Sequence, residues 1–418
     1  MKKTIKLSLA AVLTLSATGS FAAGFQLAEI STSGLGSSFS GNAVVAEDAS
    51  VVATNPALMT EFTRPEISVG GIYINAKVNI DGKLRTPRGN MDASNGSIVP
   101  NAVIPNLYFV LPVNERFSMG GGINVNYGLK SEFRKDNPAG FLMGMTSLKT
   151  INYNLSGAAK LGNGFSFGLG VNAIQAEAEL DRYAGVLIPQ KMDTEVKHLE
   201  GKEWGYGWNV GLAYNLNENH RFGFGYHSGV NLDFTGKFSS DLPLAMKGTN
   251  GASIPAELSV TLPAFWELSA YHKLTDKLAL QYSWKRTDWS AFKELKATSS
   301  MSPKPVLEKP EHFSDTNRYA LGVSYQAMEK LTLRVGIAYE EGASKKAPSV
   351  SIPDTDRTWY SVGATYQFTP NLSADVGYAY VYGHKNNFVE VQKDAPMPLT
   401  VKSRSHVNLF GLNVNYKF

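Results

Sequence analysis

The chain has 418 residues, of which 43% are hydrophobic and 11% aromatic, and its 40 Lys and Arg residues nearly balance its 36 Asp and Glu residues. This weak net charge provides no basic surface of the kind that nucleic acid requires, so no nucleic-acid partner is expected. The chain has no cysteine, which excludes a disulfide scaffold, thiol catalysis and cysteine metal sites.

Residues 1–22 have the parts of a secretory signal peptide. A start with three lysines precedes an apolar run over residues 5–17, and Ser20-Phe21-Ala22 gives the small-x-small pattern that predicts cleavage before Ala23. The apolar run is shorter than the ~20 residues of a spanning helix, and no later run reaches that length. A helical inner-membrane protein is therefore excluded. Without the three lysines, 37 Lys and Arg oppose 36 Asp and Glu, a net charge of about +1.

Residues 23–64 lack the alternation seen in the rest of the chain. They are rich in small residues and turn signals, and they precede the first strand of a barrel predicted over residues 65–418. Their Val, Leu, Phe and Met content is high for the alternative, a disordered periplasmic tail. We predict that this segment plugs the lumen.

From residue 65 onwards, strand-like segments alternate with short and long connections. Residues 164–184 and 257–273 are longer than a strand needs to cross a bilayer, so the wall should extend above the membrane. The short polar turns are 114–115, 162–164, 217–219, 275–276, 328–330 and 369–371; the longer segments are 81–100, 134–147, 185–198, 235–256, 297–308, 341–353 and 383–399. Periplasmic turns and outer loops alternate in this way in bacterial barrels, and the count predicts about fourteen strands. The expected fold class is all-β, a 14-stranded antiparallel transmembrane β-barrel with a small N-terminal plug.

The last strand has one apolar and one polar face. Phe410, Leu412, Val414, Tyr416 and Phe418 lie on the first; Gly411, Asn413, Asn415 and Lys417 lie on the second. This pattern suits lipid outside and water inside. The aromatic end resembles the assembly signal of outer-membrane barrels, which implies the barrel assembly machinery as a partner. An ordinary edge strand, the alternative, would leave an apolar edge exposed.

Several motifs occur in a consistent order from residue 23 to the end. They are Ala23-Gly24-Phe25-Gln26-Leu27, Ser33-Gly34-Leu35-Gly36, Asn55-Pro56-Ala57, Asn126-Tyr127-Gly128-Leu129, Trp204-Gly205-Tyr206-Gly207-Trp208-Asn209, Tyr282-Ser283-Trp284 with Trp289-Ser290, and Ile352-Pro353-Asp354 with Asp356-Arg357. Together these motifs resemble the FadL family of outer-membrane long-chain fatty acid transporters. The resemblance extends to the branch with the major surface barrel proteins of Haemophilus-type bacteria.

The resemblance implies an N-terminal hatch, ligand capture at an outer groove, transfer to an interior pocket, and lateral release through a kinked third strand. That strand covers roughly residues 116–133 and contains Gly120, Gly121, Gly122 and Gly128. Strand glycines mark bends or close backbone approach, so each is equally compatible with barrel curvature. Burying some fifteen methylenes contributes about 12 kcal/mol gross, less the ordering of the chain. Release into lipid keeps most of that energy, which predicts passive transport.

The resemblance also assigns candidate site residues. Arg182 and Lys309 would bind the ligand carboxylate; the alternatives are solvated charges at the barrel rim or ion pairs with Asp181 and Glu308. Phe25 would point into the pocket. The gate would comprise Asn55, Pro56, Ala57 and Gly128, with the Asn-Pro turn holding the hatch against the kinked strand. Apolar residues within polar loops indicate the outer groove, with local loop packing as the alternative: Val186, Leu187, Ile188, Leu242, Leu244 and Met246.

Other functions remain open. A porin would have a charged, unplugged lumen; a surface adhesin or antigen would use the long loops to bind host proteins; and some relatives would carry aromatic hydrocarbons. The 7 His residues show no HxH or HExxH spacing, and no serine lies in GxSxG. We therefore expect no enzyme, metal or cofactor. The expected partners are long-chain fatty acids or similar hydrophobic small molecules, outer-membrane lipid, the barrel assembly machinery and host proteins that bind the loops, and the expected state is a monomer.

Overall fold

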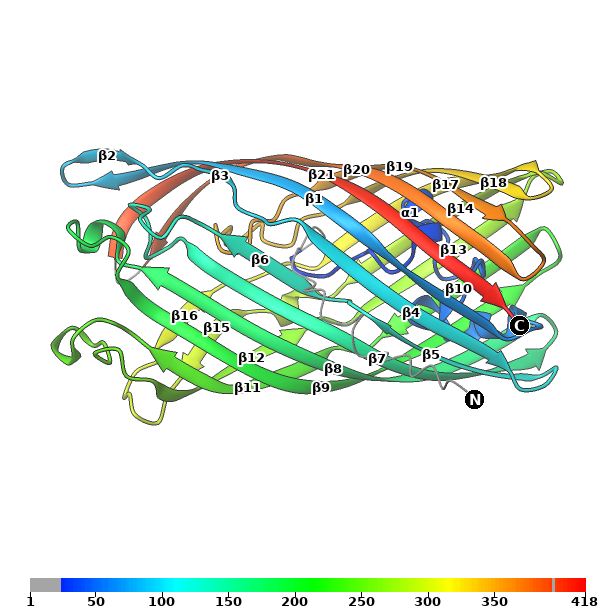
Figure 1. Cartoon of the computed structure of the whole chain (residues 1–418), viewed down its shortest axis with the longest axis horizontal. Helices are drawn as coiled ribbons and strands as arrows, with labels where there is room; N and C mark the ends of the chain where they lie inside the picture. The colour runs from blue at the N-terminus through cyan, green and yellow to red at the C-terminus, as the bar shows by residue number, and fades with distance from the viewer. Residues whose placement is uncertain (1–23, 393–394) are drawn as a thin grey trace, which may run out of the picture.

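The computed structural model describes residues 24–392 and 395–418, so the expected signal peptide and its cleavage site lie outside the described residues. One antiparallel sheet closes into a barrel of 14 wall strands, as the sequence predicts (Figure 1). In chain order these are β1 (Glu66–Thr86), β3 (Asn95–Ser97) with β4 (Ala102–Pro112), β5 (Phe117–Asn124) with β6 (Gly128–Glu132), β7 (Gly144–Gly162), β8 (Phe165–Tyr183), β9 (Glu195–Asn215), β10 (His220–His227) with β11 (Val230–Ser239), β12 (Ile254–Leu262) with β13 (Phe265–Lys273), β14 (Leu278–Thr287) with β15 (Glu294–Thr298), β16 (Leu307–Pro310) with β17 (Thr316–Met328), β18 (Leu331–Glu340), β19 (Arg357–Gln367), β20 (Leu372–Gln392) and β21 (Ala395–Lys417).

The first and last strands close the barrel. They pair in continuous register from Glu66 opposite Lys417 to Leu84 opposite Leu399, and β1 and β21 lie side by side in Figure 1. The Arg64 side chain donates hydrogen bonds to the carbonyl oxygens of Phe418 (2.8 Å) and Lys417 (3.1 Å). The seam therefore leaves no unpaired edge between the two strands.

The two faces of the wall differ as the last strand predicts. Phe410 and Leu412 are 50% and 59% exposed on the outside, whereas Asn413 and Asn415 are buried inside. Aromatic residues gather towards each end of the outer surface. Trp284, Tyr319 and Tyr339 face one another on β14, β17 and β18, and near the turns are the ring pairs Phe165–Tyr214, Tyr366–Phe368 and Tyr416–Phe418. Such aromatic girdles flank the lipid-facing band of outer-membrane barrels.

The six short turns lie where the sequence places them, but two of the predicted long loops are wrong. Residues 81–100 contain the end of β1, β2 (Gly89–Asp92) and β3, and residues 383–399 contain the ends of β20 and β21. Their Lys, Asp and Asn side chains indicated loops by composition. Above the membrane both faces of a strand meet water or a polar interior, so polar residues are compatible with a strand there.

The N-terminal segment (residues 24–64) lies within the barrel (Figure 1). It contains α1 (Thr32–Gly36), α2 (Val51–Thr54) and the 3-10 helix η2 (Pro56–Glu61). Inward-facing serines of the wall accept hydrogen bonds from its backbone, including Ser283 from Gly41 (2.8 Å) and Ser269 from Ala43 (3.2 Å). Within the described ranges, no helix is long and apolar enough to cross a membrane.

Wall glycines let this segment approach closely. A Cβ at Gly223 would stand 1.8 Å from the carbonyl oxygen of Ala43, and one at Gly211 would stand 1.8 Å from Oδ1 of Asn55. Substitution at either position would displace the segment or the strand. At these two positions a residue larger than glycine is incompatible with the contact between the wall and the N-terminal segment.

The third wall strand is interrupted. β5 ends at Asn124 and β6 begins at Gly128; β4 pairs with β5 only from Leu107 to Pro112, and β6 pairs with β7. Residues 102–106 of β4 and residues 128–131 of β6 are thus not paired with each other. The interruption, residues 125–127, follows Gly120, Gly121 and Gly122 in the sequence and does not include them. Gly120 instead admits Met59 of η2, whose sulfur would be 2.6 Å from an added Cβ.

Candidate functional site

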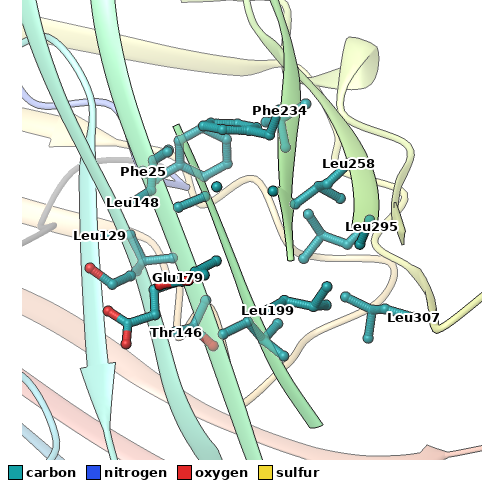
Figure 2. Close-up of a pocket in the computed structure, with 18 of the residues that line it drawn as sticks. Phe25, Leu129, Thr146, Leu148, Glu179, Leu199, Phe234, Leu258, Leu295 and Leu307 are labelled. Atoms are coloured by element: carbon teal, nitrogen blue, oxygen red, sulfur yellow. The ribbon is translucent and has the colours of Figure 1, made fainter. Parts of the chain in front are cut away.

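An apolar cavity with about 70 Å³ of room for a water-sized sphere, partly open to solvent, lies inside the barrel (Figure 2). This is below the ~300–1,000 Å³ of small-molecule sites, so a long ligand would require the lining side chains to move apart. Its apolar lining comes from inward positions of neighbouring strands, where Leu148 of β7, Leu180 of β8 and Leu199 of β9 take the place of the polar residues found elsewhere in the lumen. The other apolar lining residues include Phe25, Leu129, Phe234, Leu258, Val260, Phe292, Leu295, Leu307 and Ile352.

Neither predicted cation lines this cavity, but each lies two residues beyond a lining leucine on the same strand. Arg182 follows Leu180 on the inward face of β8, and Lys309 follows Leu307 on the inward face of β16. They meet at Ser351, whose hydroxyl accepts hydrogen bonds from Arg182 Nη2 (2.7 Å) and Lys309 Nζ (3.2 Å). The structure therefore brings together two residues that are far apart in the sequence, and their meeting point is next to the lining residue Ile352.

Lys309 is already ion-paired, whereas Arg182 donates only to neutral carbonyl and hydroxyl oxygens; neither arrangement is the one the sequence suggested. Lys309 lies 3.2 Å from Glu390 and 3.6 Å from Glu311, whereas Glu308 is exposed on the other face. The carboxylate of Asp181 contacts His198 at 2.6 Å instead of Arg182. The salt-bridge alternative therefore named the wrong acids. Strand alternation explains this, because adjacent residues of a strand point to opposite faces.

Glu311 has an unusual protonation equilibrium. It lies in the connection between β16 and β17, further towards the loops than the lipid-facing Tyr319. Burial raises the pKa of Glu311 to about 7, and the nearby Lys309 ammonium offsets only part of that rise. The charge next to Lys309 therefore changes near neutral pH.

The wall interruption is filled by the start of the N-terminal segment. The amide of Leu27 donates to the carbonyl of Asn126 (2.8 Å), and the amide of Gly128 donates to the carbonyl of Phe25 (2.9 Å). Gln26 and Tyr127 thus form an antiparallel bridge. Phe25, Gln26 and Leu27 thus supply the backbone pairing that the barrel strands themselves do not make at this position.

Phe25, a candidate pocket residue, connects this contact to the cavity. Its ring lies edge-on to Trp289 (centroids 4.7 Å apart) and Phe292 (5.2 Å), and it lines the cavity wall. Figure 2 shows it across the cavity from Leu307. Because a single residue both closes the opening and borders the cavity, movement of Phe25 would connect the two.

An asparagine network below the interruption was not predicted. Asn152 donates to Asn124 (3.0 Å) and Asn172 (3.1 Å), and Asn154 donates to Asn209 (3.0 Å). The side chains satisfy one another inside the wall of β5, β7, β8 and β9. Their i, i+2 spacing within β7 was the available signal, since it places both on one face.

The Asn55-Pro56-Ala57 turn contacts a different part of the wall from the one expected. Asn55 Nδ2 donates to the carbonyls of Ala43 (2.6 Å) and Leu212 of β9 (2.9 Å), and its Oδ1 accepts from the Ala57 amide (3.0 Å). Pro56 approaches Gly168 of β8. The turn thus fixes the segment to β8 and β9, and the interruption itself is contacted by Phe25–Leu27.

The six apolar loop residues remain candidates for an outer groove. Leu187, Leu244 and Met246 are 49%, 76% and 56% exposed, while Val186 packs against buried core residues. Their loops meet where the Asp241 amide donates to the Glu195 carbonyl (2.9 Å). The mapped apolar cavity is lined by other residues.

Near these loops, Glu179, Asp181 and His198 bring three potential metal-ligand atoms within 4.8 Å of one another. The bond between Asp181 and His198 explains most of this grouping without a cation.

A closed barrel with lipid-facing aromatic girdles, a filled lumen and an interior apolar cavity has the architecture of an outer-membrane transport protein. Residues 13–418 match the model of the outer membrane protein transport protein family (OMPP1/FadL/TodX), and the chain belongs to this family. It is a protein of the bacterial outer membrane.

Curated relatives match over nearly their whole lengths. The chain is 48% identical to the 47 kDa outer membrane protein of Pasteurella multocida and 44% identical to outer membrane protein P1 of Haemophilus influenzae, with all of both chains covered. It is 40% identical to the long-chain fatty acid transport protein of Escherichia coli K12, covering 99% of this chain and 98% of the relative.

Solved structures show the same fold. A FadL homologue of Pseudomonas aeruginosa has a TM-score of 0.86 at 22% identity, covering 95% of this chain and 100% of the other. The Pseudomonas putida toluene transporter TodX has a TM-score of 0.70 at 16% identity, with the same coverage.

Proposed function

We propose that the protein carries long-chain fatty acids passively across the outer membrane. The observation that supports this most is the apolar cavity bordered by Phe25, together with Arg182 and Lys309, which meet at Ser351 next to the lining residue Ile352. An acyl chain would occupy the leucine-lined space and its carboxylate would meet the cations. Charge-assisted hydrogen bonds of this kind fix orientation as well as adding affinity.

In this proposal residues 1–22 are the signal peptide, residues 23–64 the hatch and residues 65–418 the barrel. Ligand would first meet the exposed loop residues, such as Leu244 and Met246. Displacement of Phe25–Leu27 would then open the interruption beside β4, whose outward residues there are apolar, so that the ligand slides into lipid. Lateral transfer keeps the tail out of water and requires no energy source.

Replacing Lys309 with methionine should weaken the binding of palmitate. The substitution retains the apolar stem but removes the charge, so affinity for the carboxylate should fall roughly 10- to 100-fold. Equilibrium titration of a fluorescent fatty acid against the refolded barrel, with palmitate as competitor, measures the change.

The matched alcohol hexadecanol should bind the variant as it binds the parent, and Lys296→Met, on the exposed face of neighbouring β15, should leave both affinities unchanged. Glu390→Gln should act in the opposite direction to Lys309→Met because it frees the ammonium. Equal losses for acid and alcohol would mean that Lys309 has no head-group role.

Fatty acid affinity should also fall as the pH rises through about 7, the pKa of buried Glu311. Below this value Glu311 is neutral and leaves Lys309 available; above it the Glu311 carboxylate competes with the ligand and repels it. The same titration, on either side of neutrality, should show a decrease of roughly tenfold. A Glu311→Gln variant should lose this dependence; if its profile matches the parent, Glu311 is not the responsible group.

Aromatic hydrocarbons are the alternative cargo, favoured by the aromatic group around Phe25, Trp289 and Phe292. Competition between toluene and palmitate distinguishes the two, because a hydrocarbon would not respond to Lys309→Met. Host or phage proteins could additionally bind the loops. Deletion of residues 300–305, in the connection between β15 and β16 and outside the proposed capture loops, tests that role separately from uptake.

A further inference from the structure

Basic side chains gather on the outside of the wall where β1 and β21 close the barrel. Exposed residues Lys77, Lys83, Arg85, Lys402 and Arg404 form this basic seam patch. Odd-numbered residues of β1 and even-numbered residues of β21 share the outward face, and the register places Asp81 opposite Lys402. The five cations therefore occupy one surface instead of being distributed around the barrel.

Two acids accompany the patch. Asp81 lies 3.6 Å from Arg404, and Asp92 of β2 stands opposite Lys83. Five cations less two anions leave a charge of +3. The ion pair between Arg404 and Asp81 is itself exposed, with 68% and 58% of the side chains accessible. Such a pair is weak, so Arg404 can bind another anion.

The patch lies immediately beyond the apolar band. On β1, Val69 and Tyr73 face outward, and Lys77 follows four residues towards the loops. Tyr73 stacks with Phe410 of β21 (centroids 6.5 Å apart), which in turn contacts Tyr378 of β20 (5.2 Å). Aromatic residues at this position mark the boundary between hydrocarbon and headgroups. The basic seam patch is therefore at headgroup height; Figure 1 shows β1, β20 and β21 continuing together from there towards the loops.

The corresponding surface across the barrel has the opposite charge. The outward face of β8, β9, β11 and β12 has two lysines, Lys202 and Lys237, against five acids: Glu177, Glu179, Glu200, Asp233 and Glu257. Two less five gives −3. A general need for solubility above the membrane would not separate the signs in this way.

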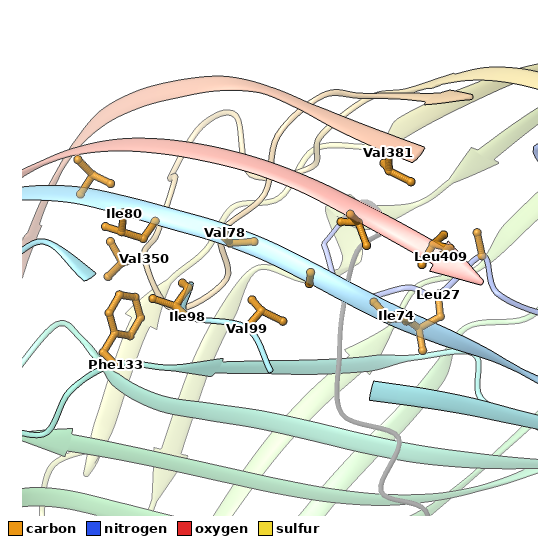
Figure 3. Packing of buried hydrophobic residues seen from close by; sticks show 14 of the residues in the cluster. Leu27, Ile74, Val78, Ile80, Ile98, Val99, Phe133, Val350, Val381 and Leu409 are labelled. Atoms are coloured by element: carbon orange, nitrogen blue, oxygen red, sulfur yellow. The ribbon is translucent and has the colours of Figure 1, made fainter. Parts of the chain in front are cut away.

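Inside the barrel, the same strand segments are rigidly supported. Their inward residues, including Val78 and Ile80 of β1, pack against Ile98, Val99 and Phe133 (Figure 3). The backbone beneath the basic seam patch is thereby held in place, so the spacing of the cations does not depend on a mobile loop.

We propose that the basic seam patch binds the phosphate groups of a phosphorylated glycolipid in the outer leaflet, with the acyl chains of that lipid against the apolar wall below. Lys and Arg are the usual partners of phosphate, and cations at a membrane surface attract anionic headgroups. Binding would orient the β1–β21 seam towards such a lipid and leave the acidic wall free of it.

The test uses the full mature barrel in neutral detergent and measures binding of a bisphosphorylated glucosamine-disaccharide lipid by native mass spectrometry. We expect Lys402→Gln/Arg404→Gln to weaken binding roughly 10- to 30-fold, with a matching loss of salt sensitivity. The matched control, Lys202→Gln/Lys237→Gln on the acidic wall, should bind as the parent does. Heat-modifiable electrophoretic mobility verifies that each variant is folded.

A dephosphorylated lipid with the same acyl chains should bind the parent weakly. Equal binding of the two lipids would overturn the proposal, as would equal losses in the two double variants. Inorganic phosphate binding as tightly as the phosphorylated lipid would overturn the assignment to a lipid. Fatty acid binding should be unchanged in the seam variant, which separates this result from the transport proposal.

Discussion

A disulfide between positions 26 and 127 should abolish uptake of long-chain fatty acids in the double variant Gln26→Cys/Tyr127→Cys. These residues face each other across an antiparallel bridge, and the flanking hydrogen bonds of Leu27 and Gly128 make them a non-hydrogen-bonded pair. Cα atoms in such pairs are about 4.5 Å apart, within the range of a disulfide. Since the chain has no cysteine of its own, this bond would be the only one available, and it would hold the interruption shut.

Cells without their own transporter, supplied with labelled oleate, provide the measurement. The oxidised variant should take up no more than cells lacking the protein, and reductant should restore uptake. The single variant Gln26→Cys should be insensitive to oxidant. Normal uptake by the oxidised, fully cross-linked double variant would show that release does not require separation of Phe25–Leu27 from the interrupted strand.

The variant Asn55→Leu should detach the hatch and make the barrel conduct ions. Asn55 is fully buried, and its side chain satisfies the carbonyls of Ala43 and Leu212 and the amide of Ala57. Leucine has a similar size but no polar atoms. Each group left without a partner destabilises the docked state by about 1–3 kcal/mol, which is a large share of what holds a short segment in place.

Planar-bilayer conductance and limited proteolysis would detect the change. We expect steady conductance where the parent shows little, and cleavage within residues 24–64 of a barrel that stays folded. Asn172→Leu, which disturbs the asparagine network without touching the hatch, should not conduct. Protease resistance and low conductance in Asn55→Leu would indicate that other contacts, such as those of Gly41 and Ala43, suffice.

The barrel was predictable because its signal is local. Alternation in β21 assigns each side chain to lipid or lumen from neighbouring residues alone, and the short turns delimit the strands. Composition misled in residues 81–100 and 383–399, where polar side chains belong to strands above the membrane. Alternation could have corrected this, since Val78, Ile80 and Leu84 continue the inward apolar row of β1.

The site was predictable only in part. Arg182 and Lys309 followed from family resemblance, but their meeting at Ser351 depends on a loop between β18 and β19 that no local pattern places. Glu390 and Glu311 are remote from Arg182 in sequence, and their approach is a property of barrel closure. An interior pocket bordered by Phe25 followed from the resemblance, but the leucines that line the cavity were missed, because the sequence alternation does not distinguish an apolar lumen from a lipid-facing surface.

The seam between β1 and β21 joins the two ends of the described barrel. This is the most non-local pairing that a chain can make, and non-local pairing slows folding because a long loop must close before any contact stabilises it. Until the register from Glu66–Lys417 to Leu84–Leu399 is formed, both strands present open edges that can pair with other molecules. Aggregation during export therefore competes directly with this one event, and losing even the last few residues would prolong the vulnerable interval.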